Sequence, residues 1–410
     1  MRILHLADVH LGMENYGRLH PQSGLSTRVL DFLRCLDEAI SYATQEHVDA
    51  VIFAGDAYKS REPSPTLQRE LARRVRTLSR EGIPIYLLVG NHDLPGLPGK
   101  ADAVDIFATL EVPGVTVGRA PGVACLQTPS GPLQVAGLPS LPRAALLPPE
   151  QARPLGQEEL SALLVERLVG MLAELAAQVQ PGVAAVLTAH LAVEGAVVGS
   201  EANLMAGNEL LVPVASLAHP AYSYVALGHI HKHQVVSEGP PPVVYSGSIE
   251  RVDFGEEAED KGFVVVELEG GQARYRFVPV AARRFLTIRC ELGEGDATEQ
   301  VLAAIAREQV AGAVVRVQVV MEQEQPIDLK AVRAALAEAE WAGPVMREVR
   351  RQVTGRSPQL TEQLTDPLQA LDEYLAARQL AGSRAQELRR YAAKLLQEMA
   401  REESLEYVEQ

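Results

Sequence analysis

Short apolar runs alternate with amphipathic stretches over residues 1–230. Five of these runs are rich in β-branched and aliphatic residues and have the length of buried strands. They are Ile3–Ala7, Ala50–Ala54, Pro84–Val89, Val183–Thr188 and Tyr222–Leu227. Between them, apolar residues recur at helical spacing around 30–40 and over 157–180. Ser64 followed by Pro65, with Gly82 further on, predicts a capped helix over 65–81. The alternation predicts an α/β domain with a largely buried sheet.

Beyond Gly271 the pattern changes to a β-α-β-α-β unit. We expect strands over 285–292, 313–321 and 345–353 and helices over 297–309 and 328–341. A polar linker then precedes two amphipathic helices, one opened by Asp366 and Pro367 and the other by a capping box at Ser383 and Gln386. The predicted organisation is a first domain over 1–282, a second over 283–353, a linker over 354–365 and a helix pair over 366–410.

The composition is that of an ordinary globular protein, with 47% apolar and 22% charged residues among 410. No run reaches the roughly 20 apolar residues of a membrane span, and the N-terminal stretch lacks a signal-peptide core. The three cysteines are far apart, which argues against disulfides or a thiolate zinc site and favours a cytoplasmic location. The net charge of −15 argues against a simple basic nucleic-acid binder, although carboxylates reserved for metals also make a chain acidic.

Each of the five apolar runs ends in side chains that ligate metals. The runs lead into Asp8 and His10, Asp56, Asn91-His92-Asp93, His190, and His229 with His231. Because sites in α/β folds lie beyond the carboxyl ends of the strands, we expect all five clusters to meet at one edge of one sheet. Gly55, Gly90 and Gly228 precede ligands, where a missing side chain lets the backbone turn into the site.

The candidate ligands are two carboxylates, one amide and four imidazoles. They are Asp8, His10, Asp56, Asn91, His190, His229 and His231. This mixed set suits Mn, Fe, Zn or Co better than Mg or Ca. Seven ligands are right for two ions, and two ions about 3.5–4 Å apart are the usual clamp for phosphate ester hydrolysis. The remaining histidines, His5, His20, His47, His219 and His233, are expected to be core or surface groups.

The ordered series D-x-H, G-D, G-N-H-D, H and G-H-x-H resembles that of the calcineurin-like metallophosphoesterase superfamily. Within it, the chain resembles the SbcD-type double-strand-break repair nucleases. The opening MRILHLADVHLG, the segment Tyr245–Arg251 with Asp253–Glu256 and Lys261, and the order of the domains carry this resemblance. It implies a β-sandwich flanked by helices, with a small α/β capping domain over the site. It also implies a metal-dependent DNA exonuclease, acting 3′→5′ on duplex ends, and a single-strand or hairpin endonuclease, both using Mn²⁺.

The resemblance also implies a role for each site residue. Asp8, His10, Asp56 and His231 would hold one ion, and Asp56, Asn91, His190 and His229 the other, so that Asp56 bridges. His92 would face the scissile phosphate and either protonate the leaving 3′ oxygen or stabilise the charge of the transition state. Asp93 would orient His92 or, alternatively, cap its loop.

Lys59 is a departure from the family pattern, because many members carry a second histidine three residues after the bridging aspartate. Its side chain either contacts a phosphate as a point charge or lies exposed on the surface. The balance between exonuclease and endonuclease action therefore stays open.

DNA contacts and partners are less determined by the residues. Arg69, Arg73, Arg76 and Arg80 share one face of the helix predicted over 65–81, as either a phosphate-binding stripe or a solvated face. Arg347 and Arg351 share a face of a predicted strand. The resemblance implies a homodimer, and it implies that 366–410 bind the coiled coil of an SbcC-type ATPase; the alternative is packing on the chain itself.

Two other functions stay open. The two-metal centre would equally serve a phosphodiesterase or phosphatase of the same superfamily acting on small nucleotides or phosphoproteins. A catalytically weak scaffold that binds DNA ends is the second alternative.

Overall fold

The computed structural model describes residues 1–95, 100–148, 151, 156–199, 209–350, 367–377 and 383–406. The chain divides into two units. The first unit comprises Met1–Cys290, Gly295–Val319 and Ile327–Met346, and it contains every predicted metal ligand. The second comprises Glu291–Glu294, Val320–Pro326 and the residues from Arg347 onward.

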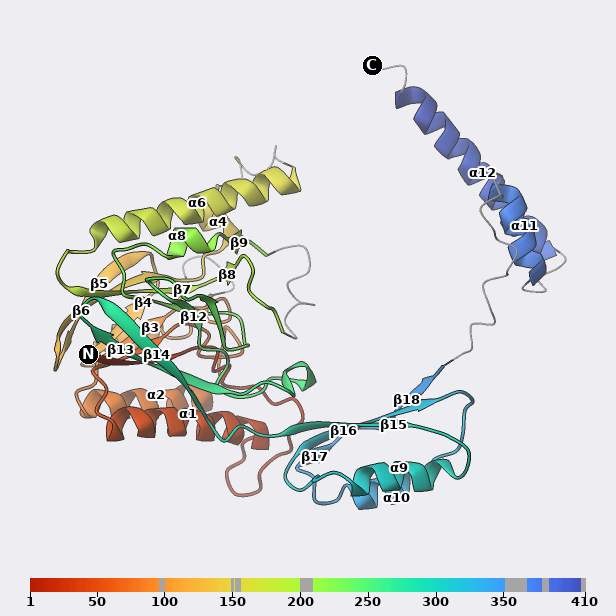
Figure 1. Cartoon of the computed structure of the whole chain (residues 1–410), viewed down its shortest axis with the longest axis horizontal. Helices are drawn as coiled ribbons and strands as arrows, with labels where there is room; N and C mark the ends of the chain where they lie inside the picture. The colour runs from red at the N-terminus through yellow and green to blue at the C-terminus, as the bar shows by residue number, and fades with distance from the viewer. Residues whose placement is uncertain are drawn as a thin grey trace. The chain divides into compact units, whose positions relative to one another are not determined.

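Two six-stranded sheets form the body of the first unit (Figure 1). The first has the order β14-β13-β1-β2-β3-β4, in which β1 to β4 are parallel and β13 and β14 antiparallel. Its strands are β1 Arg2–Leu6, β2 Ala50–Phe53, β3 Ile85–Leu88, β4 Val115–Gly118, β13 Gly262–Glu269 and β14 Gln272–Pro279.

The second sheet has the order β11-β12-β10-β7-β6-β5, with a parallel centre and an antiparallel strand at each edge. Its strands are β5 Gly122–Thr128, β6 Gly131–Leu138, β7 Ala184–His190, β10 Tyr224–Gly228, β11 Gln234–Ser237 and β12 Val243–Tyr245.

The two sheets pack face to face, and helices cover their outer faces (Figure 1). Ile52 and Tyr86 of the first sheet share an apolar core with Val186 and Tyr224 of the second. Helices α1 Thr27–Gln45 and α2 Pro65–Arg80 pack on the first sheet, and α6 Gln157–Gln178 packs on the second. The expectation of a helix-flanked α/β sandwich is confirmed.

The expectation of a single sheet is wrong. β1, β2 and β3 belong to the first sheet, whereas β7 and β10 belong to the second. A central parallel strand is buried on both faces in either sheet, so its apolar run does not tell which sheet it joins. The clusters therefore meet where the ends of two packed sheets adjoin.

Short elements complete this part of the chain. They are α3 Asp105–Thr109, α4 Arg143–Leu146, α8 Val214–Leu217, β8 Ala192–Val193, β9 Leu211–Val212 and the 3-10 turn η1 Phe254–Glu256. Among the described helices, none combines the length and apolar character needed to span a lipid bilayer.

Beyond β14 the chain forms strands β15 Phe285–Glu291, β16 Val314–Met321, β17 Trp341–Ala342 and β18 Met346–Val349, with helices α9 Ala297–Ala306 and α10 Leu329–Ala335. We call residues 283–290, 295–319 and 327–346 of the first unit the small lobe. The helix expected over 328–341 ends at Ala335. Trp341 instead pairs with Val314 as a strand and packs its ring on that of Tyr16, a contact between large aromatic groups that a continued helix does not make in this structure.

Helices α11 Pro367–Ala377 and α12 Ser383–Glu406 follow, joined by an ion pair of 2.9 Å between Asp372 and Arg389. The predicted linker 354–365 lies outside the described residues, as do Arg351 and Asp366. The division into domains stays a prediction.

Candidate dimetal site

The seven predicted ligands lie together beyond the ends of β1, β2, β3, β7 and β10. Five of these ligands, together with His92, form three overlapping groups, in each of which the possible ligand atoms all lie within 4.8 Å of one another. These groups are Asp8, His10 and His231; His10, Asp56 and His92; and Asp8, Asp56 and His190. Asn91 links His190 to His229. Its amide oxygen lies 2.9 Å from Nε2 of His190 and 3.0 Å from Nδ1 of His229.

Hydrogen bonds on the outer ring nitrogens leave lone pairs facing one another. His190 donates from Nδ1 to the carbonyl oxygen of Ala54 at 2.8 Å, so Nε2, 2.9 Å from the Asn91 oxygen, is the ring atom that presents a lone pair once it is deprotonated. His231 Nδ1 lies 2.7 Å from the carboxylate of Glu256, and its Nε2 lies 2.9 Å from Nε2 of His10. Converging lone pairs repel unless a cation or a proton lies between them, so this donor set fits divalent metal ions.

The buried charges of the cluster also attract cations. Burial opposes ionisation of Asp56, but His190 and the other histidines outweigh it and lower the pKa of this carboxyl below its usual range. Burial lowers the pKa of His190, yet Asp56 and Asp8 outweigh it and raise that pKa to about 9. Protons and metal ions therefore compete for the same site.

Four of the ligands occupy the left-handed backbone region. The φ angles are 52° at Asp8, 45° at His10, 58° at Asp56 and 100° at His229. Residues other than glycine are held there at a cost of about 1–3 kcal/mol each. The surrounding loops hold them: Asp8 N–H donates to Gly55 O at 3.0 Å, and His10 N–H donates to Asp56 O at 3.1 Å.

All three predicted glycines are needed for close approach, and at Gly55, where φ is 101°, an added Cβ would lie 2.3 Å from Nδ1 of His190. A Cβ at Gly90 would lie 2.1 Å from Oδ1 of Asp56, and one at Gly228 would lie 2.2 Å from the carbonyl oxygen of Ala54. Any side chain at these positions would push the ligand loops apart.

His92 lies beside the cluster, with its ring centroid 4.9 Å from that of His10. The backbone N–H of His92 donates to Oδ1 of Asp56 at 2.8 Å, and its ring Nδ1 donates to the carbonyl oxygen of Lys59 at 2.9 Å. Asp93 was expected to orient the ring of His92, but the backbone carbonyl of Lys59 accepts the hydrogen bond from Nδ1 instead.

Asp93 performs the alternative role of bracing the loops. Its wholly buried carboxylate accepts hydrogen bonds from the backbone N–H groups of Gly90, Ala57 and Tyr58 at 3.1–3.2 Å. It thus ties the loop that carries Asn91 to the loop that carries Asp56. Burial, with repulsion from Asp56, raises the pKa of Asp93 to about 7.

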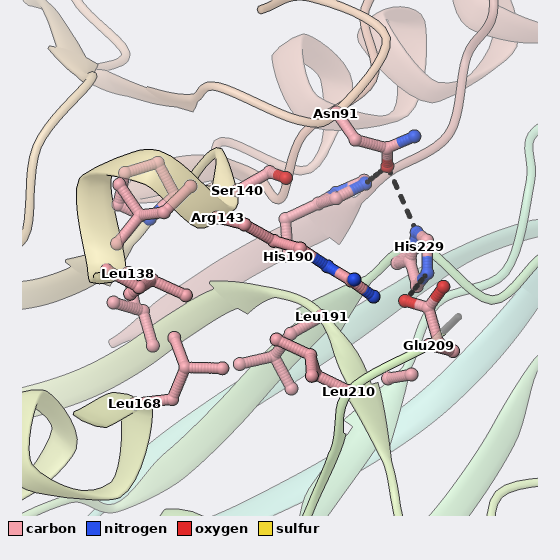
Figure 2. A pocket seen from close by; sticks show the side chains of 14 residues that line it. Asn91, Leu138, Ser140, Arg143, Leu168, His190, Leu191, Glu209, Leu210 and His229 are labelled. Atoms are coloured by element: carbon pink, nitrogen blue, oxygen red, sulfur yellow. Dashed lines mark hydrogen bonds and ion pairs between the residues drawn. The ribbon is translucent and has the colours of Figure 1, made fainter. Parts of the chain in front are cut away.

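A pocket of about 210 Å³ adjoins the cluster at Asn91, His190 and His229 (Figure 2). Leucines form much of its other wall, together with Ser140, Arg143 and Glu209. A carboxylate oxygen of Glu209 lies 2.9 Å from Nε2 of His229. Sequence reasoning missed Glu209, because no spacing relates it to a ligand.

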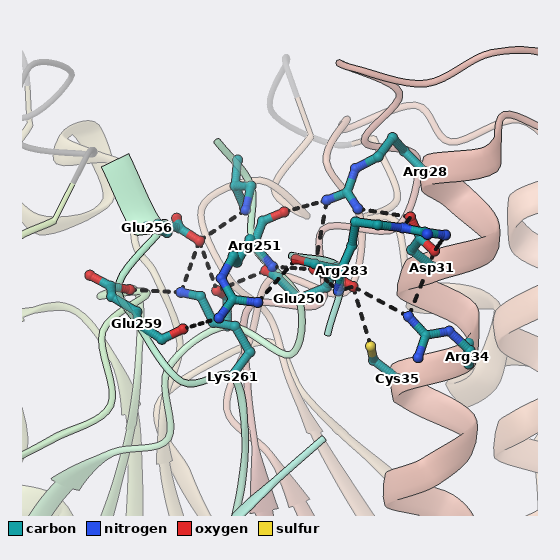
Figure 3. A network of polar contacts seen from close by, with 12 residues as sticks. Arg28, Asp31, Arg34, Cys35, Glu250, Arg251, Glu256, Glu259, Lys261 and Arg283 are labelled. Carbon is teal, nitrogen blue, oxygen red and sulfur yellow. Dashed lines mark hydrogen bonds and ion pairs between the residues drawn. The ribbon is translucent and has the colours of Figure 1, made fainter. Parts of the chain in front are cut away.

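The segment Tyr245–Glu256, singled out only by resemblance, contributes Glu250, Arg251 and Glu256 to a network of polar contacts (Figure 3). Its Glu250 is wholly buried and accepts the backbone N–H groups of Arg251 and Arg283, both at 2.8 Å. The wholly buried Arg28 of α1 lies 3.8 Å from Glu250 and 2.9 Å from Asp31. This network ties α1 to the chain that enters the small lobe.

Most of the arginines proposed to contact DNA lie on α2, where several form ion pairs. Arg69 and Arg73 form ion pairs with Glu70 at 3.0 and 2.9 Å, and Arg74 pairs with the same carboxylate at 3.3 Å. Their charge is already partly neutralised, which favours a solvated helix face over a phosphate stripe. Arg76 is exposed on the same helix, and Arg347 is exposed on β18.

Two packed sheets thus bring candidate metal ligands together, with a further histidine beside them, as a metal-dependent hydrolase requires. Residues 1–233 match the family described as calcineurin-like phosphoesterase. The SbcD component of the nuclease SbcCD from Rhodobacter capsulatus is 33% identical over 299 residues, which cover 68% of this chain and 69% of that protein. Its counterpart in Bacillus subtilis is 26% identical over 275 residues, covering 66% and 67%. The DNA double-strand break repair protein Mre11 of Archaeoglobus fulgidus is 25% identical over 308 residues, covering 71% and 62%.

The chain belongs to the calcineurin-like phosphoesterase family and, within it, to the SbcD branch. It is a metal-dependent hydrolase of phosphate esters.

Proposed function

We propose that the protein is a DNA repair nuclease, which degrades duplex ends 3′→5′ and cuts single strands and hairpins. The 33% identity to a nuclease component over two thirds of the chain carries this proposal. The metal cluster alone would serve other phosphate esters equally well.

The residues of the cluster divide into two ligand sets that share Asp56. Asp8, His10, Asp56 and His231 would hold one ion, and Asp56, Asn91, His190 and His229 the other. When bound, two such ions lower the pKa of a water molecule and offset the charge that develops on phosphorus. We propose Mn²⁺, because it accepts both the carboxylates and the imidazoles of this set.

His92 would act on the leaving group. Because its Nδ1 donates to the carbonyl oxygen of Lys59, Nε2 is the ring atom left to meet a phosphate. A proton at Nε2 would pass to the departing 3′ oxygen or stabilise the negative charge of the transition state. The side chain of Lys59 is half-buried and is proposed as a phosphate contact.

Helices α11 and α12 are proposed to bind an SbcC-type coiled-coil ATPase. Tyr374, Leu388, Tyr391 and Leu395 are large apolar side chains that these helices leave 43–58% exposed. An apolar stripe of this kind suits a partner helix. By the same family likeness we propose a homodimer, a cytoplasmic location, and a small lobe that guides DNA.

The test is Mn²⁺-dependent digestion of a blunt duplex labelled at one 5′ end, beside a small chromogenic phosphodiester. A ladder of labelled strands shortened from the 3′ end supports the proposal, and His92→Asn is the matched control. Cleavage of the small ester with intact DNA, by the chain together with its ATPase partner, would select a different phosphoesterase. Metal binding without turnover of either substrate would select a scaffold.

A further inference from the structure

The 3-10 turn η1 contacts both a candidate metal ligand, His231, and the small lobe. Asp253 opens the turn, since its Oδ1 accepts the N–H of Gly255 at 2.7 Å. In a 3-10 helix residues three apart lie on the same side, so Phe254 and Glu257 point one way and Glu256 points another. Each of the two sides has its own partners.

On the first side, Glu256 holds the ligand His231. One carboxylate oxygen lies 2.7 Å from Nδ1 of His231. The other lies 2.8 Å from Nζ of Lys261 (Figure 3). Both Glu256 and Lys261 are buried, and Lys261 also donates to the carbonyl oxygen of His231 at 3.1 Å. A carboxylate on Nδ1 fixes the tautomer in which Nε2 carries the lone pair, and it sets the ring orientation.

On the second side, the turn is anchored in the small lobe. The ring of Phe254 packs on Phe285 at 4.9 Å between centroids and lies 4.4 Å from the guanidinium of Arg316. The carboxylate of Glu257 accepts the backbone N–H of Thr287 at 2.7 Å and also its hydroxyl. Phe254 and Glu257, which flank Glu256 in the turn, are therefore both anchored in the lobe.

We propose that Glu256 is a positioning residue for His231 and that the small lobe holds it there through Phe254 and Glu257, so that a loosened lobe weakens the metal site. This inference rests on the ligand role proposed for His231 and not on the nature of the substrate. Metal affinity and lobe docking would then be coupled in both directions.

The test is Mn²⁺ binding to the metal-free full chain, measured by isothermal titration calorimetry. Glu256→Gln should weaken one of the two sites about 10- to 100-fold, as is usual when a partner of a metal-bound histidine is lost. Glu257→Ala touches no ligand and should weaken the same site about 2- to 30-fold. Because Glu257 is only half-buried, this variant stays informative even where Glu256→Gln fails to fold.

Arg18→Ala is the matched control. It removes the pair between Arg18 and Glu340 of the small lobe at 3.3 Å, which does not touch η1 and, because the Arg18 side chain is 67% exposed, contributes too little to loosen the lobe. Its Mn²⁺ affinity should equal that of the parent. Parental affinity in Glu256→Gln, or a loss in Glu257→Ala no larger than in Arg18→Ala, would overturn the inference.

The outcome is separate from that of the proposed function, because binding is measured without DNA. A chain that binds two Mn²⁺ with the expected variant effects, yet leaves DNA intact, would refute the nuclease and leave this inference standing. A parent chain that binds no Mn²⁺ would overturn both.

Discussion

Replacing Arg28 tests the energetics of the buried ionic network. Arg28→Met keeps most of the side-chain volume and removes the charge. The guanidinium is wholly buried between Asp31 and Glu250, and it lies over the rings of Phe32 and Phe285. The substitution leaves two buried carboxylates short of a partner.

Breaking a buried pair by removing one member costs about 3–5 kcal/mol. Arg34 approaches the same two carboxylates at 3.7 and 3.9 Å, but its side chain is 42% exposed. Exposed pairs contribute only about 0–1 kcal/mol. Arg34→Met is therefore a matched control, equal in chemistry and different in burial.

The pH dependence gives a second measure. Burial raises the pKa of Glu250, and Arg28 opposes that rise. Without Arg28 the pKa should rise further, so the folded variant should favour the protonated carboxyl. Its deficit relative to the parent should be largest at neutral pH and should shrink on acidification, as Glu250 takes up a proton.

Urea unfolding of the metal-free chains at several pH values measures both effects. The reasoning would be refuted if Arg28→Met lost no more than Arg34→Met, or if its deficit grew on acidification.

Three further predictions concern the site. His92→Asn should keep the Mn²⁺ affinity of the parent and lower turnover about 10²- to 10⁴-fold, since it removes the acid and no ligand; parental turnover on DNA and ester would contradict this. Mn²⁺ at about 100 times its dissociation constant should raise the free energy of unfolding by about 2.7 kcal/mol per site, and thermal unfolding with and without chelator measures this. Asp93→Asn should not displace the limb of the pH–rate profile that His92 sets, because the backbone of Lys59 orients His92; a displacement of that limb along the pH axis would restore the orienting role to Asp93.

The ligand cluster could be predicted from sequence because each piece is local. A buried strand followed at once by a ligand leaves few places for that side chain, so Asp8, Asn91 and His229 can be found without knowing which strands pair. The same locality explains why the five strands were wrongly placed in one sheet when they belong to two. Strand pairing is set by packing between distant segments, and the apolar runs carry no record of it.

The supporting carboxylates show the same limit. Glu209 and Glu256 reach their histidines from 20 and 25 residues away, through contacts that no periodic pattern records. Asp93 follows His92 directly, and adjacency suggested a hydrogen bond between them. The chain turns there, so the carboxylate meets the backbone of Gly90 and Tyr58 instead.

At Asp8, a proposed ligand with left-handed backbone, the stability of the fold and the binding of metal make opposite demands on the residue type. Glycine at Asp8 would relieve backbone strain of about 1 kcal/mol or more, and it would also remove a carboxyl whose pKa is raised because burial opposes its ionisation. Variants selected for thermal tolerance alone, in the absence of metal, should therefore lose Asp8 before the core changes. Thermostable isolates of this protein should be screened for Mn²⁺ binding first, since the easiest gain in robustness is the loss of the reaction.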